Sequence, residues 1–87
     1  MSTPLHVLLI EDSEIDALMI VRELERNGYE PVFERVERAE TFLAALGKQT
    51  WDLILADHKL PQFSDVEALQ LVKERGLDRP FIIVSGT

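Results

Sequence analysis

Short apolar runs alternate with segments of helical periodicity along this chain of 87 residues. Four runs rich in branched and aromatic side chains are predicted strands, at residues 5–10, 31–36, 53–57 and 81–84. The first and third runs are almost continuously apolar, as expected of strands buried on both faces of a sheet, and the fourth run is also apolar. The second run alternates apolar and polar residues from Val32 to Val36, which predicts a less buried strand at a sheet edge.

The segments between these strands carry apolar residues at intervals of three and four, which predicts three helices. The first covers 14–27, the second 39–46, and the third begins at a capping-box pattern formed by Ser64 and Glu67. Three glycines are predicted to end these helices: Gly28, Gly47 and Gly76. The inward faces are expected to comprise Ala17, Ile20, Val21 and Leu24 in the first helix, Phe42, Leu43 and Leu46 in the second, and Val66, Leu69 and Val72 in the third.

The regular alternation of strand and helix predicts an α/β fold. Strands separated by helices at this spacing form a parallel sheet with right-handed crossovers and helices on both faces. The sequence shows no internal repeat, linker or low-complexity segment. Residues 1–87 are therefore expected to form one domain.

The composition limits the partners that the chain can have. Sixteen acidic residues against nine basic ones give a net charge of -7, which disfavours direct binding to nucleic acid or to an anionic membrane surface. It is compatible with a divalent cation or a basic protein partner. The absence of cysteine excludes disulfides and thiolate metal sites. No apolar run approaches the roughly 20 residues that span a bilayer, and the first residues lack the basic region of a signal peptide, so we expect a cytoplasmic protein.

Acidic and hydroxyl side chains follow three of the predicted strands. Glu11 and Asp12 come directly after the first strand, Asp57 ends the third, and Ser85 follows the fourth. In a parallel sheet the carboxyl ends of the strands lie along one edge, where ligands of open α/β sheets bind. Clustered carboxylates repel one another, and oxygen ligands of this kind suit Mg²⁺. A carboxylate beside the metal could then accept a phosphoryl group.

Four stretches of the sequence resemble the receiver domain of two-component response regulators: "VLLIEDS", "VRELERNGYEPV", "LILADHKLP" and "PFIIVSGT". Each motif alone is short, but together, in register, they cover essentially the whole chain. The resemblance implies a flavodoxin-like doubly wound sheet with the strand order 2-1-3-4. It also implies a phosphorelay function and not a metabolic enzyme, because a receiver catalyses at most its own phosphotransfer and dephosphorylation.

The resemblance also assigns roles to individual residues. Asp57 would be the phospho-acceptor and Ser85 the switch hydroxyl. Mg²⁺ would be held by Glu11, Asp12 and Asp57 together with the backbone carbonyl of Lys59. The phosphoryl donor would be a sensor histidine kinase or a phosphotransfer protein.

The chain departs from the family pattern in several ways. Glu11 stands where aspartate is common, Asp65 stands where glycine is usual, and Lys59 adds a cation beside the site. Complete receivers continue through another helix, a fifth strand with an essential lysine, and a last helix, so the resemblance implies the N-terminal portion of a receiver. We accordingly expect weak phosphorylation and association of copies through the uncovered edge of the fourth strand.

Other interpretations of the same residues stay open. Asp57 could simply cap a loop, and Glu11 and Asp12 could cap the first helix. His6 and His58 do not have the spacing of metal ligands, and structural roles are expected for both. The domain could also be an interaction or dimerisation module that is not phosphorylated. A nucleotide-binding enzyme is disfavoured, because the chain has neither a G-x-G-x-x-G motif nor a P-loop.

Overall fold

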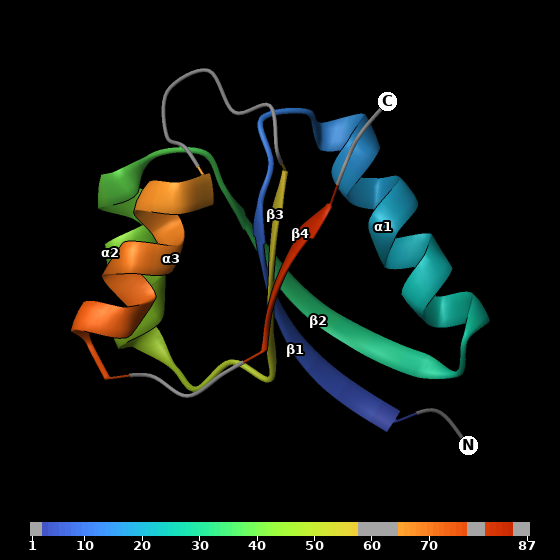
Figure 1. The fold of residues 1–87 in the computed structure, drawn as a ribbon. Helices are drawn as coiled ribbons and strands as arrows, with labels where there is room; N and C mark the ends of the chain where they lie inside the picture. The colour runs from blue at the N-terminus through green and yellow to red at the C-terminus, as the bar shows by residue number, and fades with distance from the viewer. Residues whose placement is uncertain (1–2, 58–64, 77–79, 85–87) are drawn as a thin grey trace.

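The computed structural model describes residues 3–57, 65–76 and 80–84, and at positions 57, 65, 83 and 84 it describes the backbone alone. Strands and helices alternate along the chain, as the hydrophobic pattern predicts (Figure 1). The elements are β1 (Thr3–Ile10), α1 (Glu14–Arg26), β2 (Tyr29–Val36), α2 (Ala39–Lys48), β3 (Leu53–Asp57), α3 (Asp65–Glu74) and β4 (Phe81–Val84).

The strands form one parallel sheet in the order β2-β1-β3-β4. This arrangement confirms the predicted α/β class, the strand order 2-1-3-4 and the placement of 31–36 at an edge. β1 is central, and its last residue Ile10 lies opposite Val36 of β2 and Ala56 of β3. The carboxyl ends of these three strands therefore lie at the same edge of the sheet, which we call the rim.

Helices cover both faces of the sheet, with α1 on one side and α2 and α3 on the other (Figure 1). The central strand divides its side chains between the two layers, because successive residues of a strand point to opposite faces. Val7 and Leu9 of β1 pack with Ala17 and Val21 of α1. Leu8 and Ile10 belong to the larger cluster that α2 and α3 complete.

The ends of α1 follow from local chemistry. Ser13 is the N-cap, and its Oγ accepts a hydrogen bond from the Asp16 amide at 3.3 Å. The first turn carries Glu14 and Asp16, whose negative charges favour the positive end of the helix dipole. Gly28 follows the helix with φ of 90°, a conformation that glycine adopts at little cost, so its predicted capping role is confirmed.

The predicted end of the second helix is wrong. α2 continues through Gly47 to Lys48, and Gly47 does not have the positive φ of a left-handed cap. Glycine permits such a turn but does not impose it. Phe42 and Leu46 of this helix are buried as predicted.

The inward face of α3 also differs from the prediction at one residue. Ala68 and Val72 are buried, whereas Val66 is 68% exposed. Residues two apart on a helix are separated by roughly 200°, so a helix that turns Ala68 toward the sheet turns Val66 away from it. The predicted cap Ser64 lies outside the described residues.

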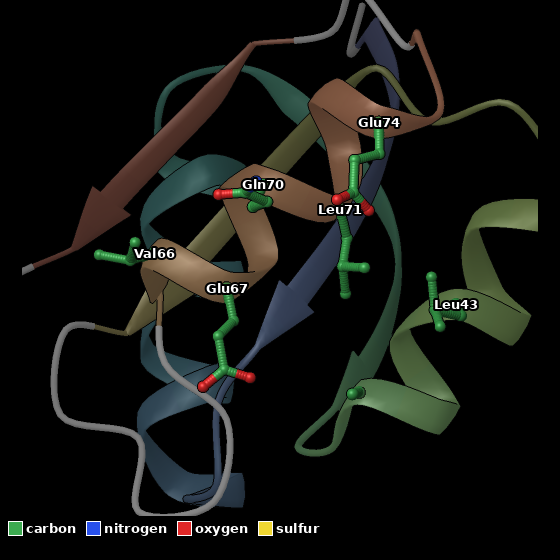
Figure 2. A pocket seen from close by; sticks show the side chains of 7 residues that line it. Leu43, Val66, Glu67, Gln70, Leu71 and Glu74 are labelled. Atoms are coloured by element: carbon green, nitrogen blue, oxygen red, sulfur yellow. The ribbon is translucent and has the colours of Figure 1, made fainter.

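A shallow groove of about 360 Å³ runs between α2 and α3. Leu43 of α2 and Leu71 of α3 line it from opposite sides, and Glu67 and Glu74 lie at its margin (Figure 2). The groove belongs to the layer opposite α1. Within the described ranges, no helix has both the length and the apolar character needed to cross a membrane.

Candidate functional site

The register of the sheet brings together two of the acidic segments that the sequence singles out. Ile10, the last residue of β1, pairs with Ala56 of β3, so Glu11, which follows β1, and Asp57, which ends β3, both come directly after this pair at the rim. The backbone of Asp57 in turn pairs with Val84 of β4. Segments far apart in the sequence therefore meet at one edge, as the parallel topology requires.

Glu11 is the most constrained acidic residue of the rim. The residue is only 4% exposed, and its Oε1 accepts a hydrogen bond from the Ser13 amide at 3.0 Å. Its own amide donates to the Val36 carbonyl of β2 at 3.0 Å. A buried carboxylate needs such partners, because burial of an uncompensated charge is costly. The backbone and the side chain of Glu11 are thus both fixed.

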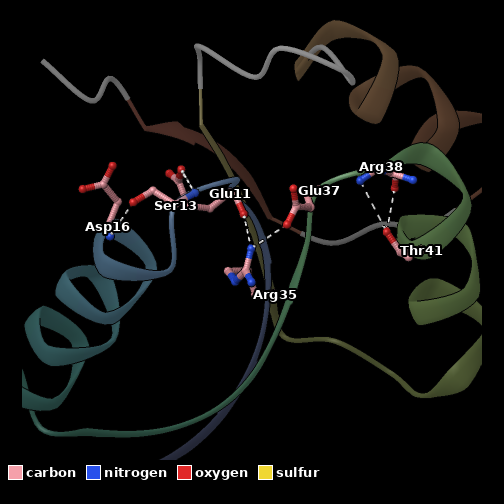
Figure 3. A network of polar contacts seen from close by, with 7 residues as sticks. All are labelled: Glu11, Ser13, Asp16, Arg35, Glu37, Arg38 and Thr41. Carbon is pink, nitrogen blue, oxygen red and sulfur yellow. Dashed lines mark hydrogen bonds and ion pairs between the residues drawn. The ribbon is translucent and has the colours of Figure 1, made fainter.

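Arg35 of β2 forms a further contact at the rim that the sequence analysis missed. Its Nη1 donates to the Glu11 carbonyl at 3.2 Å and to Glu37 Oε1 at 3.0 Å (Figure 3). In the sequence, the alternating pattern of the edge strand indicates only that Arg35 is one of its polar positions. Only the pairing of β1 with β2 shows that its guanidinium reaches the loop after β1.

Asp12 differs from Glu11 in being exposed. The alternative role as a helix cap does not apply to it, because the N-cap of α1 is Ser13 and the acids of its first turn are Glu14 and Asp16. Asp12 therefore lies on the open side of the rim, between a strand end and a helix start. This position makes its carboxylate accessible to a cation from solvent.

The remaining predicted site residues stay predictions. The Asp57 side chain is not described, and Lys59, His58 and Ser85 lie outside the described residues. Among the side chains that are described, no three His, Cys, Asp or Glu residues gather as a metal site. Glu11 and Asp12 nonetheless offer the oxygen chemistry that Mg²⁺ requires, because Mg²⁺ is typically held by one or two carboxylates and several waters. These donors fit the ion.

His6, which the sequence analysis singled out, and Trp51 lie at the opposite end of the sheet. His6 is partly exposed, with Nδ1 at 3.4 Å from Asp52 Oδ2, and its backbone amide donates to the same oxygen at 2.8 Å. Trp51 is buried in the core, and its Nε1 donates to the Ala45 carbonyl at 2.8 Å. Since Trp51 precedes β3 and Asp57 ends it, the two are separated by roughly 20 Å of extended chain. Trp51 fluorescence is therefore not a direct probe of the rim.

The strand order, the helices on both faces and the acids at the strand ends define a flavodoxin-like α/β domain with an acidic rim. The model of the response regulator receiver domain family matches residues 7–87. The chain belongs to this receiver domain family, and is thus a module of two-component phosphorelay signalling.

Two relatives illustrate the similarity. Two-component system protein A of Emericella nidulans is 27% identical over 82 residues, which are 93% of this chain and 12% of that protein. The phosphate regulon transcriptional regulatory protein PhoB of Klebsiella pneumoniae is 32% identical over 85 residues, which are 94% of this chain and 35% of PhoB. The chain thus spans about a third or less of the length of these curated relatives.

Proposed function

We propose that the chain is a Mg²⁺-dependent phospho-acceptor, that Asp57 receives the phosphoryl group from a sensor histidine kinase or phosphotransfer protein, and that Ser85 is the switch residue. We place this activity in the cytoplasm. The observation that carries the proposal is the parallel register, in which Ile10 opposite Ala56 sets the Glu11–Asp12 segment beside the end of β3. Membership of the receiver family supports the same assignment.

The chemistry follows from the carboxylates. A carboxylate oxygen of Asp57 attacks the phosphorus of a phosphohistidine, and the electron pair of the breaking P–N bond returns to the histidine nitrogen. The product is an acyl phosphate on Asp57. Bound Mg²⁺ supplies neutralisation of the charge on the transferring oxygens. Glu11 and Asp12 hold the cation, Glu11 from a buried, fixed position and Asp12 from the solvent side.

The surface beside the rim supports docking of a protein donor. Ile15, Leu18 and Met19 are exposed on one face of the first turns of α1, with Ile15 72% and Met19 63% exposed. Apolar side chains grouped on a surface mark interaction sites when they adjoin polar residues. Because α1 begins just after Asp12, a partner that covers these residues brings its own reactive group to the rim.

The alternative function is an interaction or dimerisation module that is not phosphorylated. One observation favours it: β4 is the last strand of the described sheet, and Ile82 on it is 49% exposed. An uncovered apolar edge can pair with another chain. Sedimentation across a range of concentrations tests this association, and a monomer at every concentration would contradict it.

The phosphorylation itself is tested with a small phosphodonor. The chain is incubated with acetyl phosphate and Mg²⁺, and the mass of the intact protein is measured. Because the sequence predicts weak phosphorylation, we expect slow and partial addition of one phosphoryl group, which requires Mg²⁺ and is absent in Asp57→Asn. Labelling that persists in Asp57→Asn would show another acceptor, and no labelling with or without Mg²⁺ would favour the interaction module.

A further inference from the structure

We propose that Arg35 is a positioning residue of the rim: it holds the main chain of Glu11 in the orientation that cation binding needs. This inference rests on the proposed Mg²⁺ site and adds a residue to it. Arg35 does not contact the cation in this account. It acts through Glu11.

At the end of the strand ladder, a side-chain hydrogen bond replaces the next backbone hydrogen bond. The Glu11 amide donates to the Val36 carbonyl, so one more step of the parallel ladder would pair the Glu11 carbonyl with the amide of Arg38. That amide instead donates to Thr41 Oγ1 at 3.4 Å, at the start of α2. The Glu11 carbonyl accepts from Arg35 Nη1 instead (Figure 3). The arginine side chain thus extends the contact between β1 and β2 beyond the last backbone bond.

Three hydrogen bonds constrain Glu11. Its amide bonds to Val36, its carbonyl to Arg35 and its carboxylate to the Ser13 amide. The first two contacts come from β2, and together they fix the peptide groups on both sides of the Glu11 α-carbon. Without Arg35 the peptide between Glu11 and Asp12 loses this hydrogen bond to the side chain of β2. That peptide determines the direction in which the Asp12 side chain leaves the chain.

Arg35 is itself held in place by its surroundings. The same Nη1 also donates to Glu37 Oε1 at 3.0 Å, and the Arg35 side chain is largely covered. An arginine guanidinium is planar with donors in fixed directions, so the second contact restricts the geometry of the first. Glu37 therefore holds Arg35 in the position from which it reaches Glu11.

Charge and position predict opposite effects of removing Arg35. A positive charge beside an acidic site opposes cation binding, so if Arg35 acted only through its charge, its removal would strengthen Mg²⁺ binding. If Arg35 positions Glu11, its removal weakens binding, because residues that orient metal ligands matter to affinity although they do not touch the metal. The sign of the change separates the two roles.

The test compares Mg²⁺ affinity among variants of the 87-residue chain by isothermal titration calorimetry. We expect Arg35→Gln to weaken binding about tenfold, at the lower end of the usual effect of an outer-shell contact. Arg35→Lys keeps the positive charge and one hydrogen-bond donor group, so this variant should bind Mg²⁺ with intermediate affinity. Lys48→Gln is the matched control, because it removes one cation and an ion pair to Glu34 of the same strand without reaching Glu11. It should bind as the wild type does.

Hydrogen exchange of the metal-free protein provides a second readout that does not depend on the cation. Arg35→Gln should accelerate exchange of the Glu11 and Ser13 amides, and Lys48→Gln should not. Unchanged or tighter Mg²⁺ binding by Arg35→Gln would overturn the inference while leaving the proposed function intact. If the wild type binds no Mg²⁺, the proposed function fails, and unchanged exchange in Arg35→Gln would overturn the inference by itself. Should Arg35→Gln not fold, Arg35→Lys decides: affinity and exchange equal to the wild type would overturn it.

Discussion

At each end of the sheet a carboxylate accepts a hydrogen bond from a backbone amide. The charged groups near the two carboxylates differ. At the amino end of β3, Asp52 accepts from the His6 amide and lies 3.4 Å from the His6 imidazole, with both side chains about half exposed. At the rim, Glu11 is buried. Asp12 follows it in the chain, and Asp57 ends the neighbouring strand β3. The Asp52 carboxylate has a basic side chain beside it, whereas the Glu11 carboxylate accepts from the Ser13 amide and the acidic Asp12 follows Glu11 in the chain.

This difference indicates which of the two ends of the sheet would be stabilised by binding a cation. A carboxylate with a basic neighbour closes a structural contact and is largely satisfied. Like-charged carboxylates held together by the fold destabilise it until a cation enters. The core also favours this division, because Trp51 anchors the amino end through the Ala45 carbonyl. We therefore expect the Trp51 end to contribute to stability, and we propose that the rim binds the cation.

The largest effect is expected for Asp12→Asn, which removes the exposed carboxylate of the rim. Mg²⁺ affinity should fall about a hundredfold, or about 2.7 kcal/mol, because a direct ligand loses its charge. In the absence of metal, the free energy of unfolding should rise slightly as repulsion is relieved. Calorimetric titration and urea denaturation measure the two quantities. Equal Mg²⁺ affinity in Asp12→Asn and the wild type would remove Asp12 from the site.

A smaller loss is expected for Glu11→Gln. The glutamine keeps an oxygen that can accept from the Ser13 amide, so the start of α1 should persist, as circular dichroism would show. The lost charge should weaken Mg²⁺ binding about tenfold, or about 1.4 kcal/mol. A variant that binds Mg²⁺ normally would reduce Glu11 to a purely structural residue, the same role as that of Asp52.

The opposite pattern is expected for Trp51→Phe. This change keeps an aromatic ring in the core but removes the donor to the Ala45 carbonyl. The free energy of unfolding should fall by about 1 kcal/mol, with Mg²⁺ affinity unchanged. Urea denaturation with and without Mg²⁺ checks both statements. A marked change in affinity would mean that the two ends are coupled through β3.

The smallest effect is expected for Asp52→Asn. The contact with His6 is exposed on both sides, and exposed ion pairs contribute about 0–1 kcal/mol. An asparagine oxygen can also replace the acceptor of the His6 amide. Stability should change by less than about 1 kcal/mol, and Mg²⁺ binding should not change. A loss of Mg²⁺ binding comparable to that of Asp12→Asn would erase the distinction between the two ends.

The sequence predicted the elements well because burial leaves a regular trace along the chain. The apolar runs that begin at Leu5 and Leu53 became the inner strands β1 and β3, and the stripe with Ala17 and Val21 became the buried face of α1. The errors arose where local pattern underdetermines orientation. Val66 is as apolar as Val72, and only the packing of α3 against the sheet turns one outward and the other inward.

The site was predictable to the extent that topology determines it. Parallel strands bring Glu11 and the end of β3 together whatever the details of the loops. Arg35 could not be predicted in this way, because its contact with Glu11 depends on the register of β2 against β1 and on the turn of the chain into α2. A single charged residue in an alternating strand carries no such signal.

Paramagnetic Mn²⁺ in place of Mg²⁺ tests whether the rim is the cation site. The backbone amide signals of the protein are followed by NMR as substoichiometric Mn²⁺ is added. We expect the signals of Glu11, Asp12 and Asp57 to broaden first and those of His6 and Asp52, roughly 15 Å or more away along the strands, to stay sharp. Broadening that begins at His6 and Asp52, or that affects both ends equally, would contradict the assignment of the rim as the cation site.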